Sequence, residues 1–484
     1  MSSPASLSDV PLHDEADPLA EARTQLAVVT ADAPRAVAIV GAGLGYLTEA
    51  ARTRWPDAVL VVLEPLRDLA EAAKARTPAL YERGRVHILT GPDYAGADVL
   101  WKVFDAADAV SPSSGLSPAV VVHPVLAQAA PAPMAKALRV AQRAIDAATM
   151  NARAREENAG RYLCNTLRNV AHLALGPDPG RLRGQFAGVP AIVVGAGPSL
   201  DGAIPALQAL GGRALLIATD TSWRPLAAAG IDPHLVVATD PTEANGRHLR
   251  GVRGTRQTWV LAEGSVDPDA LHTLRGRVGI FRIAGHHPWP WLNGLDLDRA
   301  VVKAWGSVLT SAYDVAVTAG CAPIVFVGSD LSFTDGRPYC RGTSAEQDWA
   351  VHTARGASLR RVWTNTIEAR ALRREPDVTG GETPTAPHLI EFRNWLVAEA
   401  GKQPAGRVIS ASGAGILMGA GITQASLATV LSGFDDRPDL RRQIAQLLTA
   451  QPDEAVASRL ADALRALDAQ CRDEAAARTA ATLE

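Results

Sequence analysis

Short apolar runs alternate with alanine-rich, helical stretches along the first quarter of the chain. The runs are four or five residues long and lie at 36–40, 59–63, 86–89 and 119–122. Runs of this length between helical segments are typical of a parallel α/β sheet. The pattern predicts a Rossmann-like domain over residues 31–130, preceded by a flexible N-terminus at 1–30.

A helical period follows, and then a second series of apolar runs. Residues 131–188 predict a helical connector that breaks at a proline- and glycine-rich stretch. The second series predicts a central α/β domain over 189–420 with a mostly parallel sheet. Its runs lie at 191–194, 214–218, 235–238, 259–262, 278–283 and 324–327.

The last part of the chain, 421–484, carries leucines at intervals of three and four residues and predicts a C-terminal helical region. Helices of this kind usually cover a core. The alternative is a platform for a protein partner.

Composition narrows the class of partner. The net charge is −3 over 484 residues, which gives no electrostatic reason to expect nucleic acid. The four cysteines lie far apart, so neither a zinc site nor a disulfide framework is indicated. No apolar stretch reaches the roughly 20 residues of a spanning helix, and no export signal is visible. We therefore expect a cytoplasmic protein without membrane insertion; its oligomeric state stays open.

A glycine-rich turn follows the run at 191–194 and is the strongest sign of chemistry. It contains Gly195, Gly197, Pro198 and Ser199 and leads into a helical stretch. Backbone amides at such a helix start can hold a phosphate, and the serine hydroxyl can bind it or cap the helix. The alternative is a turn that only lets the helix pack closely on the sheet.

Polar side chains follow several of the predicted central strands. They are Asp220, Thr221, Asp240, Ser329 and Asp330. Open α/β sheets bind ligands at the carboxyl ends of their strands, so together these residues predict a site. Each one alone could instead be a helix cap or part of an Asx turn.

A second glycine turn opens the N-terminal domain. Gly41, Gly43 and Gly45 follow the first predicted strand, and Glu64 ends the next one, where an acidic residue contacts ribose hydroxyls. The turn resembles the cofactor loop of class I methyltransferases. The alternative is a structural Rossmann-like module with no ligand.

Four segments in a fixed order carry a wider resemblance. They are GAGPSLD at 195–201, ATDTSWRPLAAAGIDPHLVVATDP at 218–241, GSVLTSAYDVAVTAGCAPIVFVGSDLSF at 306–333 and SASGAGILMG at 410–419. Over roughly 190–420 the chain resembles the motility accessory factor (Maf) family of flagellin glycosyltransferases. The same core is similar to archaeal 6-hydroxymethyl-7,8-dihydropterin pyrophosphokinases, and the GPSL turn is similar to the CMP-binding loop of bacterial sialyltransferases.

The Maf resemblance implies transfer of a nonulosonic acid, of pseudaminic or legionaminic type, from its CMP-activated form to Ser or Thr of flagellin. The transfer would support flagellum assembly and motility and would need no metal cofactor. Gly195, Gly197 and Ser199 would hold the CMP phosphate, while Asp220 and Asp240 would orient ribose, base or sugar hydroxyls.

Three further positions follow from the same resemblance. The helix start at Gly306 and Ser307 would face the carboxylate of the sugar. Asp330 is the first candidate for the base that accepts the proton of the acceptor hydroxyl.

A rival base is His286 or His287, because an imidazole titrates near neutrality and this segment follows a predicted strand. The alternative is a surface histidine pair with Trp289 and Trp291 packed beneath it. A metal site at the pair lacks a third ligand at recognisable spacing.

The chain departs from the family pattern in two places. Cys340 stands near the point where many Maf proteins carry a histidine, so no role of that histidine is transferred. SASGAGILMG replaces an INATEGGAKI-like segment and loses its acidic residue, which leaves Ser412 and Gly413 as site candidates.

Two other functions stay open. A pterin pyrophosphokinase would need ATP and Mg²⁺, with Asp220, Asp240 or Asp330 as metal ligands. A catalytically inactive, nucleotide-binding flagellin chaperone would bind CMP or flagellin without turnover.

Overall fold

A computed structural model describes most of the chain. The described residues are 11–82, 84–91, 94, 100–252, 257–274, 276–284, 286, 288–295, 297, 299–437, 439–449 and 454–483. The chain divides into two compact units, Met1–Asn158 (unit 1) and Ala159–Glu484 (unit 2), and helix α7 (Pro131–Arg168) runs from one into the other. The five-part division expected from the sequence stays a prediction.

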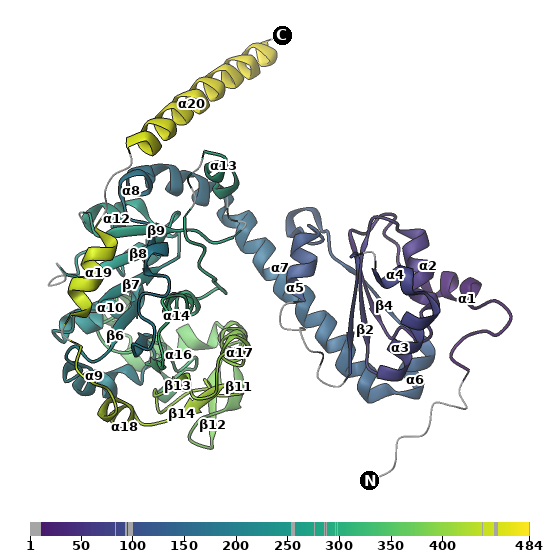
Figure 1. The fold of residues 1–484 in the computed structure, drawn as a ribbon, viewed down its shortest axis with the longest axis horizontal. Coiled ribbons are helices and arrows are strands. Elements are labelled where there is room, and N and C mark those ends of the chain that lie inside the picture. Colours follow the sequence, from purple (N-terminus) through teal and green to yellow (C-terminus); the bar gives the residue numbers. More distant parts are fainter. Residues whose placement is uncertain are drawn as a thin grey trace. The chain divides into compact units, whose positions relative to one another are not determined.

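Unit 1 is built on a parallel sheet with the strand order β3-β2-β1-β4. The strands are β1 (Ala36–Val40), β2 (Val59–Glu64), β3 (Val86–Thr90) and β4 (Ala119–Val122). Every strand residue of β1 is buried, because helices cover both faces of the sheet (Figure 1). The helices are α1 (Pro18–Gln25), α2 (Tyr46–Arg54), α3 (Arg67–Arg76), α4 (Pro78–Glu82), α5 (Trp101–Ala106) and α6 (Pro124–Ala129).

The N-terminal part of unit 1 is more ordered than the sequence predicted. Residues 18–25 form α1, because Asp17 accepts a hydrogen bond from the Ala20 amide at 2.8 Å and Pro18 suits the first helical turn. Leu26 follows and is fully buried in the unit 1 core. The expected flexible N-terminus at 1–30 is therefore wrong for 18–28, where this apolar contact holds the chain.

Unit 2 is built on an eight-stranded parallel sheet with the order β14-β13-β10-β5-β6-β7-β8-β9. The strands are β5 (Ala191–Val194), β6 (Leu215–Thr219), β7 (Leu235–Ala238), β8 (Trp259–Glu263), β9 (Val278–Phe281), β10 (Ile324–Val327), β13 (Val408–Ser410) and β14 (Ile422–Gln424). A separate antiparallel hairpin joins β11 (Arg373–Pro376) and β12 (Glu382–Thr385). This arrangement confirms the predicted α/β class with its mostly parallel central sheet.

Helices cover both faces of this sheet. One core cluster contains Trp223 and Leu226, and the other contains Tyr313 and Phe326. The described helices are α8 (Val170–Leu175), α9 (Leu200–Gln208), α10 (Asp220–Ala228), α11 (Glu243–Gly246), α12 (Pro268–Leu271), α13 (Trp289–Asn293), α14 (Val308–Thr318), α15 (Ala345–Ala354), α16 (Leu359–Glu368), α17 (Pro387–Ala400), α18 (Leu427–Ser432), α19 (Leu440–Leu448) and α20 (Glu454–Leu483). Within the described ranges, no helix has the length and apolar character to cross a bilayer.

The end of the chain is mostly helical, as expected. Residues 422–424 are an exception, since they form β14 beside β13 within the region predicted to be helical. Helix α20 begins against the core through Leu460, which is 2% exposed. Figure 1 shows α20 in yellow, leading to the C-terminus.

The strand order creates a switch point in each sheet. In unit 2 the chain runs outward from β5 through β6, β7, β8 and β9, and then returns to place β10 on the other side of β5. In unit 1 it runs from β1 through β2 to β3 and returns to place β4 beside β1. Ligands of open α/β sheets bind at the carboxyl ends of the strands next to such a point.

Candidate functional site

The predicted glycine turn and Asp330 meet at the switch point of unit 2. The turn at 195–199 follows β5, and Asp330 comes three residues after β10, the parallel neighbour of β5. The Ser199 amide donates to Asp330 Oδ2 at 3.1 Å, and the Ser199 hydroxyl donates to Asp330 Oδ1. Two residues that are 131 positions apart in sequence thus form one polar pair, which we call the switch-point pair.

The Asp330 carboxyl is enclosed by its surroundings. Its residue is 0% exposed, and burial raises its pKa, while hydrogen bonds from Ser199 and Thr334 act in the opposite direction. The Ile416 amide donates to the Asp330 carbonyl at 2.8 Å, and Gly415 packs so closely on the Asp330 backbone that a side chain there would overlap it. Ser199, in contrast, is only partly buried.

The glycines of the turn allow β5 and β10 to approach each other. A Cβ on Gly195 would lie 2.6 Å from the Gly328 carbonyl oxygen, and one on Gly197 would lie 2.8 Å from the same atom. The Gly195 amide donates to Val327 at 2.9 Å and the Gly197 amide to Gly328 at 2.7 Å. In this conformation these two amides are therefore not available to a phosphate, contrary to the role expected for them.

Ser329 and Ser412 extend the site on the β13 side. The Ser329 amide donates to Ser412 Oγ at 3.0 Å, which links the end of β10 to the segment after β13. Gly413 follows with a φ of 70°, a conformation that side chains rarely adopt. The segment that departs from the family pattern, 410–419, thus lies beside Asp330. It contains the candidate residues Ser412 and Gly413.

Asp220 begins α10 at the end of β6, next to the turn. It is 3% exposed and accepts hydrogen bonds from the amide and hydroxyl of Thr221 at 2.6 and 3.0 Å. Burial raises its pKa to about 7, and the charge of Asp240 adds to this shift. A carboxyl that titrates near neutrality is suited to general acid or base catalysis.

Asp240 has a local structural role. Its Oδ1 accepts hydrogen bonds from the amide and hydroxyl of Thr242 at 2.8 and 2.5 Å, which is an Asx turn after β7. The side chain is half-buried, so the turn does not exclude contact with a ligand.

The helix start at Gly306 and Ser307 lies at the same edge of the sheet. Helix α14 packs on β5, β6, β7 and β10 and ends six residues before β10 begins at the opposite edge. The Ser307 hydroxyl caps this helix by accepting from the Leu309 amide at 3.3 Å. Gly306 has a φ of 64° and faces the Phe392 ring.

His286 is not brought to Asp330 by the strand order. It follows β9, which lies five strands from β10, or about 24 Å at the usual strand spacing. Its ring stacks on that of Tyr162 with 4.8 Å between centroids. The alternative candidate His287 lies outside the described residues.

The sequence did not single out Arg337, which holds the turn from outside. Its guanidinium donates to Asp201 Oδ2 at 2.5 Å and to the Pro198 carbonyl at 3.2 Å, and its side chain is 15% exposed. The Cys340 amide donates to Ala196 O at 2.9 Å from the same segment. In the sequence, only the place of this arginine, shortly after Asp330, could have pointed to its role.

The N-terminal turn has its own carboxylate. Glu64 is 0% exposed, and its Oε2 accepts from the Ala42 and Gly43 amides at 2.6 and 3.2 Å. Gly41, Gly43 and Gly45 have φ values of 84°, 54° and 87°. Glu64 thus lies beside the turn, as the sequence predicted. Its binding of a ligand stays a prediction.

The donor set gives a limited fit to a metal ion. Among the described residues, no group of three His, Cys, Asp or Glu side chains is arranged to hold one. Mg²⁺ is usually bound by one or two carboxylates together with substrate phosphates. Asp220 or Asp330 could serve in that way, as the pyrophosphokinase alternative requires.

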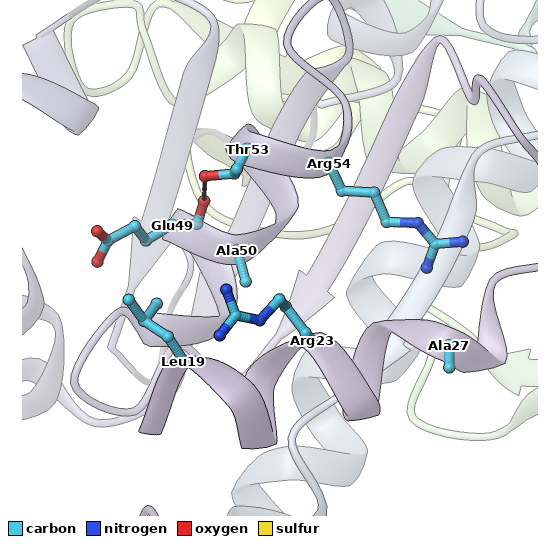
Figure 2. Close-up of a pocket in the computed structure, with 7 residues that line it drawn as sticks. All are labelled: Leu19, Arg23, Ala27, Glu49, Ala50, Thr53 and Arg54. Atoms are coloured by element: carbon cyan, nitrogen blue, oxygen red, sulfur yellow. Dashed lines mark hydrogen bonds between the residues drawn. The ribbon is translucent and has the colours of Figure 1, made fainter. Parts of the chain in front are cut away.

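Two clefts lie away from the switch point of unit 2. One of about 470 Å³ lies between α1 and α2 in unit 1, with Arg23, Glu49 and Arg54 on its walls (Figure 2). Another of about 310 Å³ is lined by Ile231, His234 and Arg441 beside the start of β7. Neither contains a predicted site residue.

Known proteins resemble parts of this chain. Residues 164–336 match the family model described as 6-hydroxymethylpterin diphosphokinase MptE-like. An uncharacterized protein of Treponema pallidum (strain Nichols) is 32% identical over 132 residues, or 27% of this chain. This match spans 47% of that relative, less than half of its length.

The fold as a whole resembles that of a solved enzyme. The structure of MAf glycosyltransferase from Magnetospirillum magneticum AMB-1 aligns over 94% of this chain and 69% of its own, with a TM-score of 0.53 and 17% identity. At this identity the likeness is one of fold. Together with the MptE-like match it confirms the resemblance that the sequence motifs indicated.

Proposed function

We propose that unit 2 is a glycosyltransferase that moves a nonulosonic acid from a CMP-activated donor to a Ser or Thr hydroxyl. The observation that carries the proposal is the switch-point pair, which lies where open α/β sheets bind ligands. The four motifs around it occur in the Maf order, and the chain shares its fold with a Maf enzyme.

The reaction breaks the bond between the anomeric carbon of the sugar and the phosphate oxygen of CMP. A new bond forms between that carbon and the acceptor oxygen, CMP leaves with the electron pair, and a base takes the acceptor proton. Negative charge grows on the leaving phosphate, so the Ser199 hydroxyl at the turn would stabilise it. The Ser199 hydroxyl, which donates to Asp330 in this structure, would turn toward the phosphate when CMP binds, while the Ser199 amide stays on Asp330.

Asp330 and Asp220 are the two candidates for the base. Both oxygens of Asp330 accept hydrogen bonds from Ser199, which suits it to positioning the turn. Asp220 has a pKa of about 7 and lies two strands from β10, about 10 Å along the sheet. We therefore favour Asp220 as the base and assign Asp330 to the orientation of Ser199, in place of the base expected from the sequence.

The acceptor we propose is flagellin, modified in the cytoplasm before the filament assembles, with no metal required for the transfer. Support for this acceptor comes from the Maf resemblance alone. Mass spectrometry of flagellin expressed with and without the protein tests it, and unmodified flagellin in both samples would overturn it.

A second candidate is supported by the MptE-like match over 164–336. An ATP-dependent pyrophosphokinase would use the same edge of the sheet, with Asp220 or Asp330 holding Mg²⁺ between phosphates. The two functions differ in nucleotide and in metal dependence.

Calorimetric titration with CMP, and with ATP in the presence and absence of Mg²⁺, separates them. We expect metal-independent CMP binding that Ser199→Ala weakens at least tenfold, with Ser358→Ala unchanged, because Ser358 is exposed and its hydroxyl caps the start of helix α16. Mg²⁺-dependent ATP binding without a CMP signal would favour the pyrophosphokinase. CMP binding without sugar transfer would favour the inactive chaperone.

A further inference from the structure

A group of buried polar side chains lies at the switch point of unit 1 and has no part in the proposed transfer. It consists of the turn Gly41–Gly45, Glu64 and His123, with His13 against it; we call it the unit 1 cluster. Glu64 and His123 are both 0% exposed. They reach the turn from β2 and from the end of β4, the neighbours of β1 on its two sides.

His123 points a hydrogen-bond donor at the turn. Its Nδ1 accepts from the Leu126 amide at 3.4 Å, and burial lowers its pKa to about 4. The ring is therefore neutral near pH 7, and its proton belongs on Nε2. Nε2 has no partner within the described part of the chain and lies 2.9 Å from the place of a Cβ on Gly43. A buried donor in this state can form a hydrogen bond to a ligand atom that enters beside the turn.

Glu64 offers acceptors and excludes phosphate. Its Oε1 accepts from the Leu66 amide at 2.9 Å, and its Oε2 accepts from the two turn amides described above. A carboxylate thus stands where other glycine turns hold a phosphate, and among the described residues no Lys or Arg is paired with it. A phosphate would meet like charge there.

The His13 side chain covers the turn through one hydrogen bond and two ring contacts. Its Nε2 accepts from the Leu44 amide at 3.1 Å, and its ring meets those of Tyr46 and His123 edge-on at 4.9 and 5.1 Å. It comes from the segment before α1 and is only partly buried. Moving this one side chain would uncover the Leu44 amide and Nε2 of His123.

We propose that the unit 1 cluster binds a ribonucleoside that carries no phosphate at the turn. After His13 moves aside, the vicinal hydroxyls of the ribose donate to Glu64. One acceptor atom of the nucleoside accepts a hydrogen bond from Nε2–H of His123. The position supports this, because an acidic residue at the end of the second strand binds ribose hydroxyls in open α/β sheets. The proposal is independent of the transferase function of unit 2.

Calorimetric titration of the full chain with adenosine, guanosine and uridine tests it. Each is compared with its 2′-deoxy form and its 5′-monophosphate, in the wild type and in Ser199→Ala. We expect at least one ribonucleoside to bind, at least tenfold tighter than its 2′-deoxy form and tighter than its 5′-monophosphate. Heat that Glu64→Gln removes and that Ser199→Ala leaves unchanged belongs to unit 1, so failure here is distinct from failure of CMP binding.

Variants locate the site. Glu64→Gln should weaken nucleoside binding at least tenfold, while Glu71→Gln, at an exposed position on α3, should leave it unchanged. His13→Ala should tighten binding at least threefold, and it remains informative if Glu64→Gln does not fold. Binding of no ribonucleoside at millimolar concentration, tighter binding of 5′-monophosphates, or no gain from His13→Ala would overturn the proposal.

Discussion

The two glycine turns resemble each other in sequence and need glycine for different physical reasons. In unit 1, all three glycines of the turn lie in the left-handed region, with φ between 54° and 87°. In unit 2, Gly195 and Gly197 are not in that region, but a Cβ on either would press into the Gly328 carbonyl. The first turn needs glycine for its backbone angles and also for space, since a Cβ on Gly43 would lie 2.8 Å from His13 and 2.9 Å from His123. The second needs it only for the space between two strands.

Both turns nevertheless end with a buried carboxylate on their amides. Glu64 comes from the strand that follows the turn in sequence, whereas Asp330 comes from the strand that returns on the other side. The comparison teaches that one local motif can be completed from either neighbour. In unit 1 the Glu64 carboxylate accepts from two turn amides, whereas in unit 2 the Asp330 carboxylate accepts from one amide and one hydroxyl of Ser199. Only the second arrangement leaves a side-chain donor that can turn toward a ligand.

The largest effect should come from adding a methyl group at the crowded turn. Gly197→Ala would force Asp330 and Gly328 apart, so we expect sugar transfer to fall at least 100-fold and unfolding free energy to fall by about 1–3 kcal/mol. Gly45→Ala strains the backbone and brings a Cβ to 3.2 Å from Ala73 and Tyr81, so it should cost about 1–2 kcal/mol with transfer unchanged. Transfer assays and denaturant unfolding measure both.

Gly202→Ala is the control for these variants. Nothing lies within 4 Å of its would-be Cβ in helix α9, so it should gain up to about 1 kcal/mol. Equal losses of transfer in Gly197→Ala and Gly45→Ala would contradict the distinction between the two turns.

Removing the charge of the switch-point pair should have the next largest effect. Asp330→Asn keeps the size of the side chain but loses its charge, and an NH2 donor replaces one of the two oxygens that accept from Ser199, so we expect transfer to fall about 100- to 1,000-fold. Steady-state kinetics with a CMP-sugar donor measures this. Asp269→Asn, on the exposed start of α12, should leave the rate unchanged, and a fall of less than threefold in Asp330→Asn would rule out its assigned role.

The buried carboxyl of Asp220 should make stability depend on pH. Its folded pKa of about 7 lies above the usual value of 3.8, so the folded state holds the proton more tightly. The favourable contribution is complete below about pH 4 and is lost as the pH rises to about 7, by on the order of a few kcal/mol. Denaturant unfolding of wild type and Asp220→Asn between pH 4 and 8 measures the difference.

The wild type should lose stability relative to Asp220→Asn over this range. Parallel curves for the two proteins would show that the Asp220 carboxyl ionises normally and would remove the reason to prefer it as the base.

The smallest effect is expected at His286. Because β9 lies five strands from β10, His286→Ala should change the transfer rate less than threefold. The same kinetic assay checks this. A 100-fold loss would instead restore His286 as the base and mean that its segment folds over the site.

Much of the fold followed from local pattern. Strands at 36–40, 191–194 and 324–327 were predicted to the residue, because each is a buried apolar run between turn signals. Strands β13 and β14 were missed, since each has three residues and glycines lie between them. The run at 278–283 ends at 281, and Arg282 continues only as an isolated bridge to Val301.

The site was predicted in part for the same reason. Ser199 and Asp330 were named because each follows an apolar run, and the structure brings them into contact. His286 also follows an apolar run, but that run forms β9, at the edge of the sheet. The residue type and its place in the sequence do not tell where in the sheet a strand will lie. Arg337 was missed because an arginine in a loop has no local signature of the partner it will find.

The sequence by itself determined which segments become buried strands and where the chain turns with glycine. Only the tertiary structure decided that β10 lies beside β5, which joins Ser199 to a carboxylate 131 residues away. It also decided that Asp220 is buried deeply enough to titrate near neutrality. The physical reason is that hydrophobic period specifies a strand and its burial, whereas strand order and desolvation depend on how the whole sheet and its helices pack.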